Sequence, residues 1–342
     1  MSAVKLDTIT YGHPLPDIGE VVRTAESRGY DAWLTSEVQY DPFLPCAVAA
    51  VATERIQLGT AITVAFARNP MTVAQSAHNI QQALGERPFL LGLGSQIKPH
   101  ITKRFSQTWP DRPAAAMREF VQALHAIWSC WNDGEELAFR GEYYTHSIMT
   151  PMFTPPPNPV TPKVWLAAVG PGMTRVAGEV ADGIICHGFT TATYFTETTL
   201  PAVEEGVGRV DGRTRADVEV VLPPFVITGY TDEQRAGARQ AVLQQIGFYG
   251  STPAYRPVLE AHGWGELGEE LHRLSRNDGW ARMPEVINDE VVDAFAIVAD
   301  PDVLGEAIVE RFGGAADRIQ LGEAYGLSDE HLTHVREVLA DA

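Results

Sequence analysis

Four side chains capable of acid–base chemistry follow stretches of sequence that are typical of β-strands. They are His13, Glu37, His100 and His187. Imidazole and carboxylate groups can exchange protons near neutral pH, so each of the four is a candidate for proton transfer. A histidine at the end of a strand is as often a hydrogen-bonded packing residue, and that alternative stays open.

A glycine-rich turn follows the predicted strand Val164–Val169. The turn reads Gly170-Pro171-Gly172, and a helix begins close to Thr174. The first turn of a helix presents free backbone N–H groups and the positive end of the helix dipole, which together bind phosphate. We therefore expect a phosphate at this turn, with a tight strand-to-helix connection that binds nothing as the alternative.

A second glycine-rich segment, LGLGSQ at residues 91–96, ends another predicted strand. Its glycines allow a ligand to approach the backbone, and Ser95 and Gln96 can hydrogen-bond to that ligand. The segment lacks the third glycine and the acidic residue of the dinucleotide fingerprint. A nicotinamide-binding site of that type is therefore disfavoured.

A cluster of basic residues comes directly after this segment. Lys98, His100, Lys103 and Arg104 are close together in a chain that has few bases elsewhere. The cluster predicts a loop that faces a phosphate, a carboxylate or a polyacidic tail, and it could equally be the solvated start of a helix. We group His13 with Lys98 and His100 as residues that face the substrate or an anion.

Metal binding and disulfide formation are not indicated. Cys46, Cys130 and Cys186 are scattered and are expected to be buried thiols, whereas His331 and His334 have no third ligand nearby. Motifs of common hydrolases and kinases are absent from the sequence. Five aromatic residues near the C-terminal third are interpreted as the core of an insert rather than a base-stacking platform: Phe248, Tyr249, Tyr255, Trp264 and Trp280.

Short β-rich runs alternate with helical patterns along the whole chain. We predict eight strands, at Val4–Thr10, Ala32–Thr35, Ile56–Val64, Phe89–Gly92, Val164–Val169, Gly183–His187, Val218–Ile227 and Arg318–Leu321. Amphipathic helices are predicted between them, at Asp17–Arg28, Thr72–Leu84, Pro113–Trp131, Met173–Ala181 and Pro301–Phe312. Eight such units predict an α/β fold, a (β/α)8 TIM barrel, whose active site lies at the C-terminal ends of the strands.

Two segments interrupt this alternation. Residues 134–162 are rich in turns and proline, and they predict a surface crossover. Residues 231–289 predict a helical insertion before the last strand. We expect one barrel domain over residues 1–342 that carries this insert.

The composition restricts the partners of the protein. The chain has 342 residues, with 26 Lys and Arg against 44 Asp and Glu, and a formal net charge of -18. Such a charge repels nucleic acid and anionic lipid, so binding to either is not expected. The longest apolar stretch, near Cys46–Ala52, is too short to span a bilayer. We expect a cytoplasmic protein that acts on a small molecule.

Four segments give the chain a specific resemblance to a known group of proteins. They are AESRGYDAWLTSE at 25–37, ERIQLGTAITVAFARNPMTVAQ at 54–75, ERPFLLGLGSQ at 86–96 and VWLAAVGPGMTRVAGEVADGIICHG at 164–188. In this order they resemble the bacterial luciferase-like monooxygenase superfamily, and within it the branch that depends on the deazaflavin coenzyme F-420. Proteins of this superfamily are (β/α)8 barrels, commonly homodimers, that hold FMN or coenzyme F-420 at the C-terminal ends of the strands.

The resemblance implies positions for the cofactor. Gly170, Pro171, Gly172 and Met173 correspond to the residues beside its phosphate, and Gly94, Ser95 and Gln96 to those along its ribityl chain. In the deazaflavin branch, a bulge in the third strand contains a non-proline cis peptide behind the ring. The matching bond in this sequence joins Ala61 and Ile62.

The chain also departs from the sugar-phosphate dehydrogenases of that branch. Those enzymes have an Asp-His pair and a Glu where this sequence has Glu37-Val38 and Gln96-Ile97. Our first hypothesis is hydride transfer between coenzyme F-420 and a small organic substrate, with Glu37 and His187 as the candidate catalytic residues. An FMN-dependent monooxygenase and a non-catalytic flavin-binding paralogue are the alternatives.

Overall fold

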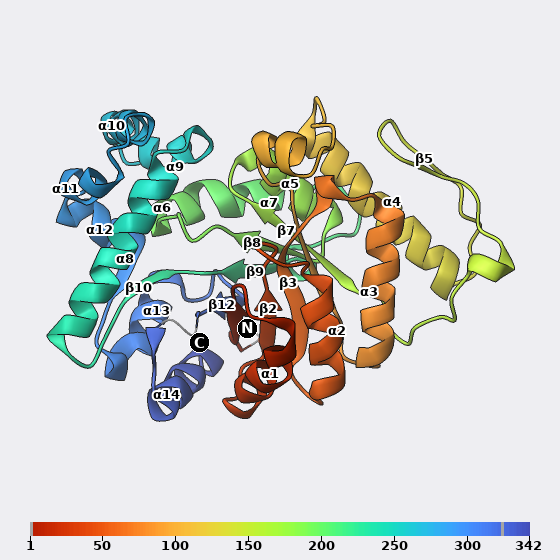
Figure 1. Ribbon diagram of the computed structural model, residues 1–342, viewed down its shortest axis with the longest axis horizontal. Coiled ribbons are helices and arrows are strands. Elements are labelled where there is room, and N and C mark those ends of the chain that lie inside the picture. The colour runs from red at the N-terminus through yellow and green to blue at the C-terminus, as the bar shows by residue number, and fades with distance from the viewer. Residues whose placement is uncertain (1–2, 323–324) are drawn as a thin grey trace.

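The computed structural model describes residues 3–322 and 325–342. Eight parallel strands close into a barrel in the order β1, β12, β9, β8, β7, β4, β3, β2. Their bounds are β1 (Lys5–Thr10), β2 (Ala32–Thr35), β3 (Gln57–Val64), β4 (Leu90–Gly94), β7 (Lys163–Ala168), β8 (Gly183–Cys186), β9 (Glu219–Leu222) and β12 (Arg318–Gln320). The predicted (β/α)8 barrel is therefore confirmed (Figure 1).

Helices surround the barrel. They are α1 (Ile18–Ser27), α2 (Phe43–Ala52), α3 (Pro70–Leu84), α4 (Pro113–Asn132), α5 (Pro171–Val180), α6 (Ala192–Tyr194), α7 (Leu200–Val207), α13 (Leu304–Phe312) and α14 (Asp329–Ala340). In α1 the buried residues Ile18, Val22 and Ala25 lie on one stripe, as the helical period requires. The sequence pattern did not predict α2, because this helix is apolar on nearly every side and lacks the polar stripe that reveals a helix.

The predicted strand Val218–Ile227 is wrong as a single element. The chain forms β9 and then, after Pro223 and Pro224, a separate strand β10 (Phe225–Ile227). Proline has no N–H to donate to a neighbouring strand, so the barrel ladder stops there. Strand β10 pairs in parallel with β11 (Ala296–Val298) outside the barrel.

The insert between β10 and β11 is helical, as expected. Its helices are α8 (Asp232–Gly250), α9 (Arg256–Glu260), α10 (Gly265–Arg276), α11 (Met283–Val286) and α12 (Asp289–Phe295). They enclose an apolar cluster of their own, which includes Ile246, Leu259 and Leu271. The insert therefore lies beside the barrel as a second packed layer (Figure 1, left).

The predicted surface crossover at 134–162 contains a short antiparallel hairpin. Its strands are β5 (Phe139–Arg140) and β6 (Thr145–His146). Glu119 of α4 anchors the turn by accepting hydrogen bonds from the backbone N–H groups of residues 142, 143 and 144. The segment extends away from the barrel (Figure 1, right).

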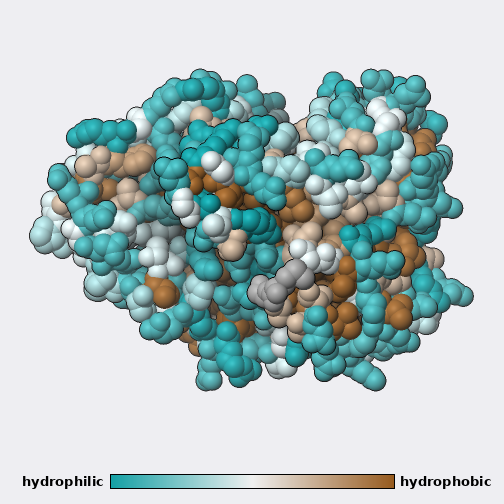
Figure 2. All heavy atoms as spheres, turned by 180° about the vertical axis from the view of Figure 1, so that it is seen from behind, coloured by the Kyte–Doolittle hydropathy of each residue, from teal (hydrophilic) through white to brown (hydrophobic). Residues whose placement is uncertain are grey.

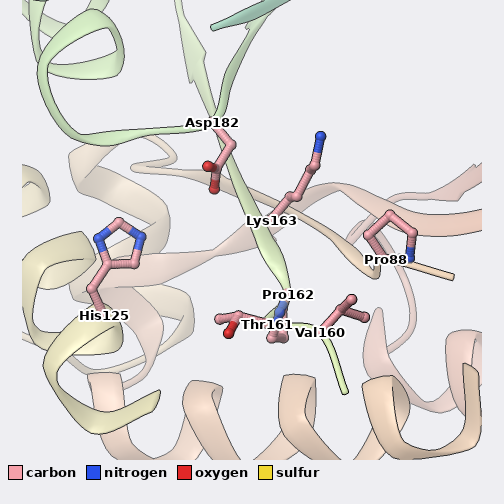
Figure 3. A pocket seen from close by; sticks show the side chains of 7 residues that line it. All are labelled: Pro88, His125, Val160, Thr161, Pro162, Lys163 and Asp182. Atoms are coloured by element: carbon pink, nitrogen blue, oxygen red, sulfur yellow. The ribbon is translucent and has the colours of Figure 1, made fainter. Parts of the chain in front are cut away.

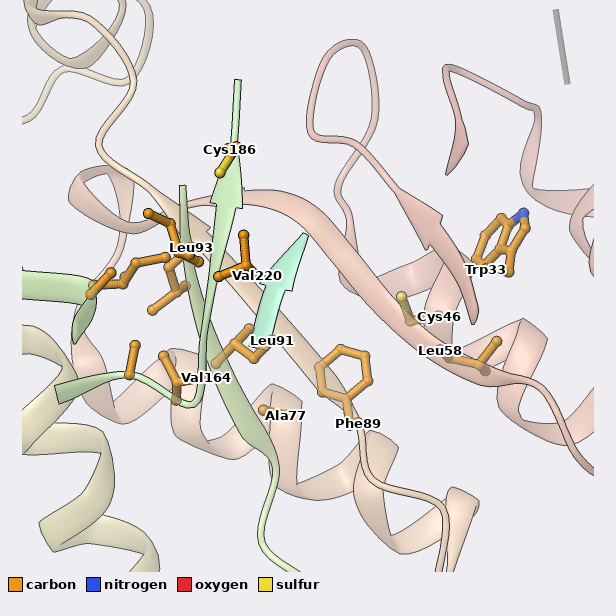
Figure 4. Close-up of a cluster of buried hydrophobic side chains, with 14 of the residues drawn as sticks. Trp33, Cys46, Leu58, Ala77, Phe89, Leu91, Leu93, Val164, Cys186 and Val220 are labelled. Atoms are coloured by element: carbon orange, nitrogen blue, oxygen red, sulfur yellow. The ribbon is translucent and has the colours of Figure 1, made fainter. Parts of the chain in front are cut away.

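Two apolar layers stabilise the barrel. The outer layer lies between strands and helices and contains Trp33, Phe89 and Leu91, all buried (Figure 4). The predicted burial of the three cysteines is also confirmed. The inner layer fills the barrel itself with Ile9, Leu34, Leu90, Trp165, Ile185 and Val221. A filled interior leaves the strand ends as the place for a site.

Candidate functional site

Glu37 lies directly after β2 and is held by an ion pair. One carboxylate oxygen, Oε2, accepts hydrogen bonds from Arg68 Nη1 at 2.7 Å and from the N–H of Val64 at 2.7 Å. The other, Oε1, lies 2.9 Å from the same Arg68 nitrogen. The Glu37 side chain is only 4% exposed. Both oxygens are therefore engaged within the protein.

The same loop anchors β3 through its backbone. The Glu37 N–H donates to the carbonyl of Ile62 at 3.1 Å, and Ser36 Oγ donates to the carbonyl of Ala61 at 2.6 Å. The pairing of β3 with β4 shifts register between Thr60 and Thr63, so a bulge lies here. The peptide bond between Ala61 and Ile62 is cis, as the resemblance implied.

Gly94 at the end of β4 faces this bulge. A Cβ atom at Gly94 would lie 2.8 Å from Ile62 Cδ1, so a side chain there would require Ile62 to shift. The structure thus brings Glu37, Ala61, Ile62 and Gly94 into one group. After Gly94, Ser95 Oγ donates to the carbonyl of Gln96, and Gln96 has a positive φ of 58°.

The predicted phosphate turn forms the start of α5. Gly170 is the N-cap and Pro171 is the first helical residue, so α5 begins earlier than the sequence indicated. The N–H and hydroxyl of Thr174 both donate to the carbonyl of Gly170. A Cβ atom at Gly170 or Gly172 would meet nothing within 4 Å. The space beside Gly170 and Gly172 is therefore open, and the N–H groups of the first turn of α5, at Gly172 and Met173, have no partner within the helix, so a phosphate fits these residues.

The basic cluster after β4 lies on the surface. Lys98 and His100 are exposed, and residues 100–104 form one turn of π-helix. Arg104 donates to the carbonyl of Val38 at 2.7 Å, so it connects this loop to the loop after β2. His13, after β1, is half-buried. The cluster is available to an anion outside the barrel.

His187 follows β8 and is held in one tautomer. The N–H of Phe189 donates to His187 Nδ1 at 2.9 Å, so Nδ1 has a lone pair and Nε2 carries the proton in the neutral ring. Desolvation lowers the pKa of His187 to about 4. The ring is therefore neutral near pH 7 and presents Nε2–H as a donor.

Two aromatic residues of the insert complete the surroundings of His187. Its ring centroid lies 4.4 Å from that of Tyr249 and 4.7 Å from that of Tyr255. The sequence predicts Tyr249 and Tyr255 only as core of the insert, because residue spacing gives no sign that α8 packs against the end of β8. Phe248 and Trp280 were also predicted as core, which is wrong, since they are 54% and 45% exposed.

The top of the molecule is hollowed (Figure 2). The loop after β4, orange-yellow at the top of Figure 1, lies on the same side of the molecule as α9 and α10. Seen from behind, the molecule has a notch at the top with apolar residues at its base (Figure 2). This side carries the C-terminal ends of the strands.

Two pockets lie at the opposite end of the barrel. One of about 430 Å³ is lined by Pro88, His125, Val160, Thr161, Pro162, Lys163 and Asp182 (Figure 3). A second of about 590 Å³ shares Lys163 and Asp182 with it. Lys163 begins β7 and Asp182 directly precedes β8, so both pockets lie at the N-terminal ends of the strands. In TIM barrels that end serves stability, so we place the functional site at the other one.

The part of the chain that the structure describes contains no group of three residues suited to hold a metal ion. His331 lies 2.5 Å from Asp302, and His334 lies 3.0 Å from Glu306, so each histidine connects α14 to its neighbours.

Within the described ranges, no helix is both long and apolar enough to cross a membrane.

A closed parallel barrel with a glycine turn at the start of α5 and a bulge in β3 places the chain among the (β/α)8 barrel proteins. The chain belongs to the luciferase-like monooxygenase family, whose sequence profile matches residues 2–318.

Several relatives can be compared with the chain. An uncharacterized protein of Mycobacterium tuberculosis is 53% identical over 274 residues, which is 80% of either chain. The F-420-dependent glucose-6-phosphate dehydrogenase of Kineococcus radiotolerans is 32% identical over 214 residues, covering 58% of this chain and 61% of that one. The solved coenzyme F-420-dependent tetrahydromethanopterin reductase of Methanopyrus kandleri matches with a TM-score of 0.78 at 20% identity, covering 99% of this chain and 98% of that one. The chain therefore has the same fold as this reductase. Its relatives include proteins that are named as oxidoreductases.

Proposed function

We propose that the protein is an oxidoreductase that transfers a hydride between coenzyme F-420 and a small organic substrate. The observation that carries this proposal is the open space before the N–H groups of Gly172 and Met173, at the end of a barrel strand beside β4. The names of the relatives support the deazaflavin in particular. A homodimer in the cytoplasm completes the proposal, and these two points rest on the resemblance to the superfamily.

The described residues would hold the cofactor in four places. The phosphate would bind at Gly170, Pro171, Gly172 and Met173, the ribityl chain would lie along Gly94, Ser95 and Gln96, and the ring would rest on Ala61 and Ile62. The acidic tail would reach Lys98 and His100. When bound, a deazaflavin supplies two-electron hydride chemistry, and the protein supplies orientation and exclusion of water.

We assign Glu37 to positioning rather than to proton transfer. Its carboxylate already accepts hydrogen bonds from Arg68 and Val64, and its N–H fixes the bulge at Ile62. Removing a partner from such a pair leaves a buried charge without compensation. Glu37 therefore acts by keeping the surface beneath the cofactor ring in place.

An FMN-dependent monooxygenase is the second candidate, favoured by the family to which the chain belongs. A non-catalytic flavin-binding paralogue is the third. The three differ in which cofactor binds and whether hydride moves. The exposed Lys98 and Lys103 favour the deazaflavin, because its polyacidic tail is an anion that FMN lacks.

The test is a titration of the apoprotein with each cofactor, followed by absorbance. We expect coenzyme F-420 to bind at least about tenfold more tightly than FMN, a difference of about 1.4 kcal/mol that shrinks as salt increases. The double variant Lys98→Gln, Lys103→Gln should lose most of that difference. Arg276→Gln, an exposed position on α10, is the matched control. Equal or tighter binding of FMN at low salt would favour the monooxygenase.

A further inference from the structure

Three rings form a wall between the barrel and the insert. His187 comes from the end of β8, Tyr249 from the last turn of α8, and Tyr255 from the short helix at Pro253–Tyr255. The two tyrosine rings are 5.4 Å apart, and each lies within 4.7 Å of the His187 ring. We call these three residues the ring wall.

The ring wall is only partly buried, since His187, Tyr249 and Tyr255 all have intermediate exposure to solvent. Tyr11, directly after β1, is 64% exposed. Burial of part of its surroundings and nearby Tyr249 raise the pKa of Tyr11. Tyr11 therefore lies near the ring wall and remains open to solvent. Tyr325, after β12, is close enough for Tyr11 to add to the effect of burial and raise the pKa of Tyr325 to about 12.

Among the described residues, no charged side chain contributes to the pKa shifts of His187, Tyr249 and Tyr255, which arise from burial and, for Tyr255, also from Tyr249. In the described part of the chain, the other rings that pack on it are Phe189 and Phe248. Burial and the neighbouring Tyr249 raise the pKa of Tyr255 to about 12, so its hydroxyl stays protonated. An anion brought here would lose hydration without gaining a cation from these rings. A neutral molecule would lose little.

We propose that the ring wall binds the substrate of the site described above, and that this substrate is an uncharged compound with a carbonyl or hydroxyl oxygen. The oxygen accepts a hydrogen bond from His187 Nε2, and the apolar body lies against Tyr249 and Tyr255. This inference rests on the proposed function and adds the class of substrate. His187 serves as a neutral donor here, not as a base, because its Nδ1 lone pair is already used by Phe189.

The experiment compares benzaldehyde with benzoate, which share a ring and differ in charge. Binding is measured by saturation-transfer NMR, which needs no turnover, on the apoprotein and on the protein with coenzyme F-420 added, and cofactor affinity is measured separately. We expect benzaldehyde to bind at least about tenfold more tightly than benzoate. His187→Asn, which removes the proposed donor, and Tyr249→Ala, which removes the apolar ring, should each weaken benzaldehyde binding by about fivefold, with less than about a twofold change in cofactor affinity.

Tyr230→Ala is the matched control for Tyr249→Ala. Tyr230 lies two residues before α8, at the end opposite Tyr249, roughly 25 Å away at 1.5 Å per helical residue. This variant should bind benzaldehyde as the parent does. An independent readout is the nitrogen NMR spectrum of His187, which should show the proton on Nε2 at pH 7.

The outcomes separate this inference from the proposed function. Benzoate binding as tightly as benzaldehyde, or a His187 proton on Nδ1, would overturn the inference. So would intact cofactor binding with no benzaldehyde binding at all. If benzaldehyde binds and depends on the ring wall, but coenzyme F-420 does not bind to the apoprotein, then the proposed function fails and the ring wall stands.

Discussion

At the scale of single residues, the site divides into open positions and engaged ones. Gly172 has free space around it, whereas Glu37 has both carboxylate oxygens in hydrogen bonds. A substitution at an open position changes what the protein can bind. A substitution at an engaged position removes hydrogen bonds and therefore changes the local structure and its stability. The two kinds of variant therefore distinguish binding from positioning.

Gly172→Val is expected to weaken cofactor binding by about tenfold or more, because its side chain would occupy the space before the N–H groups of α5. The fold should survive, since the new Cβ meets no atom within 4 Å. The measurements are the dissociation constant of coenzyme F-420 and the thermal midpoint. An unchanged constant in a folded variant would show that the turn is only structural.

Glu37→Gln is expected to reduce the stability of the protein by about 1–3 kcal/mol, because Arg68 loses the more buried of its two acidic partners and keeps only Asp41, 2.9 Å away. Cofactor affinity should weaken with it, since the bulge beneath the ring loosens. Chemical denaturation and cofactor titration measure the two effects. If instead single-turnover hydride transfer slows by about ten- to a thousandfold with affinity and stability unchanged, then Glu37 transfers a proton, as the sequence first indicated.

At the scale of elements, the close approach of β3 and β4 depends on a glycine. A Cβ atom at Gly92 would lie 1.9 Å from the carbonyl oxygen of Thr60, directly before the bulge. The same strand pair carries Ile62 against Gly94. The shape of the bulge, on which we propose that the cofactor ring rests, therefore depends on how closely these two neighbouring strands pack.

Gly92→Ala should destabilise the barrel by about 3 kcal/mol or more, because backbone atoms cannot move aside as a flexible side chain can. Gly172→Ala is the control, since that position is open and exposed. Urea denaturation of both variants measures the difference. Equal stability of the two would mean that β3 and β4 can separate without cost.

At the scale of the whole molecule, one buried ion pair joins the first and last strands of the barrel. Arg318 of β12 donates to both carboxylate oxygens of Asp7 in β1 at 2.7 Å, and both side chains are fully buried. Trp165 stacks against the guanidinium. Burial opposes the charge of Arg318, but Asp7 and Glu219 outweigh it and raise the Arg318 pKa. The pair helps to close the barrel.

Asp7→Asn is expected to cost about 3–5 kcal/mol, because it leaves the buried guanidinium of Arg318 with only the more distant carboxylate of Glu219. The double variant Asp7→Leu, Arg318→Met should recover much of that loss, since no buried charge remains. Equilibrium unfolding of both variants gives the comparison. A single variant as stable as the parent would show that Glu219, 3.5 Å from Arg318, compensates the charge alone.

The pH dependence of stability follows from His187. Burial lowers its folded-state pKa to about 4, so between about pH 4 and 6.5 the unfolded chain binds more protons than the folded one. His187 therefore stabilises the fold above this range and loses up to roughly 3 kcal/mol of that contribution as the pH falls through it. His187→Asn should flatten the stability curve in this window. An unchanged slope would mean that His187 titrates alike in both states.

The alternation of strands and helices could be predicted from the sequence, because hydrophobic periodicity and glycine turns are local properties of a chain. It therefore gave the barrel, the helical insert and the turn at Gly170–Met173. The resemblance to a family added the cis bond between Ala61 and Ile62, which no local pattern reveals.

The contacts between side chains that are distant in the sequence are visible only in the tertiary structure. The ion pair of Glu37 with Arg68 joins residues 31 positions apart, and the contact of His187 with Tyr249 joins the barrel to the insert. Such contacts depend on how elements pack across long stretches of chain, and composition and periodicity do not carry that information. For the same reason, the sequence indicated an acid at position 37 but not that its charge is already paired.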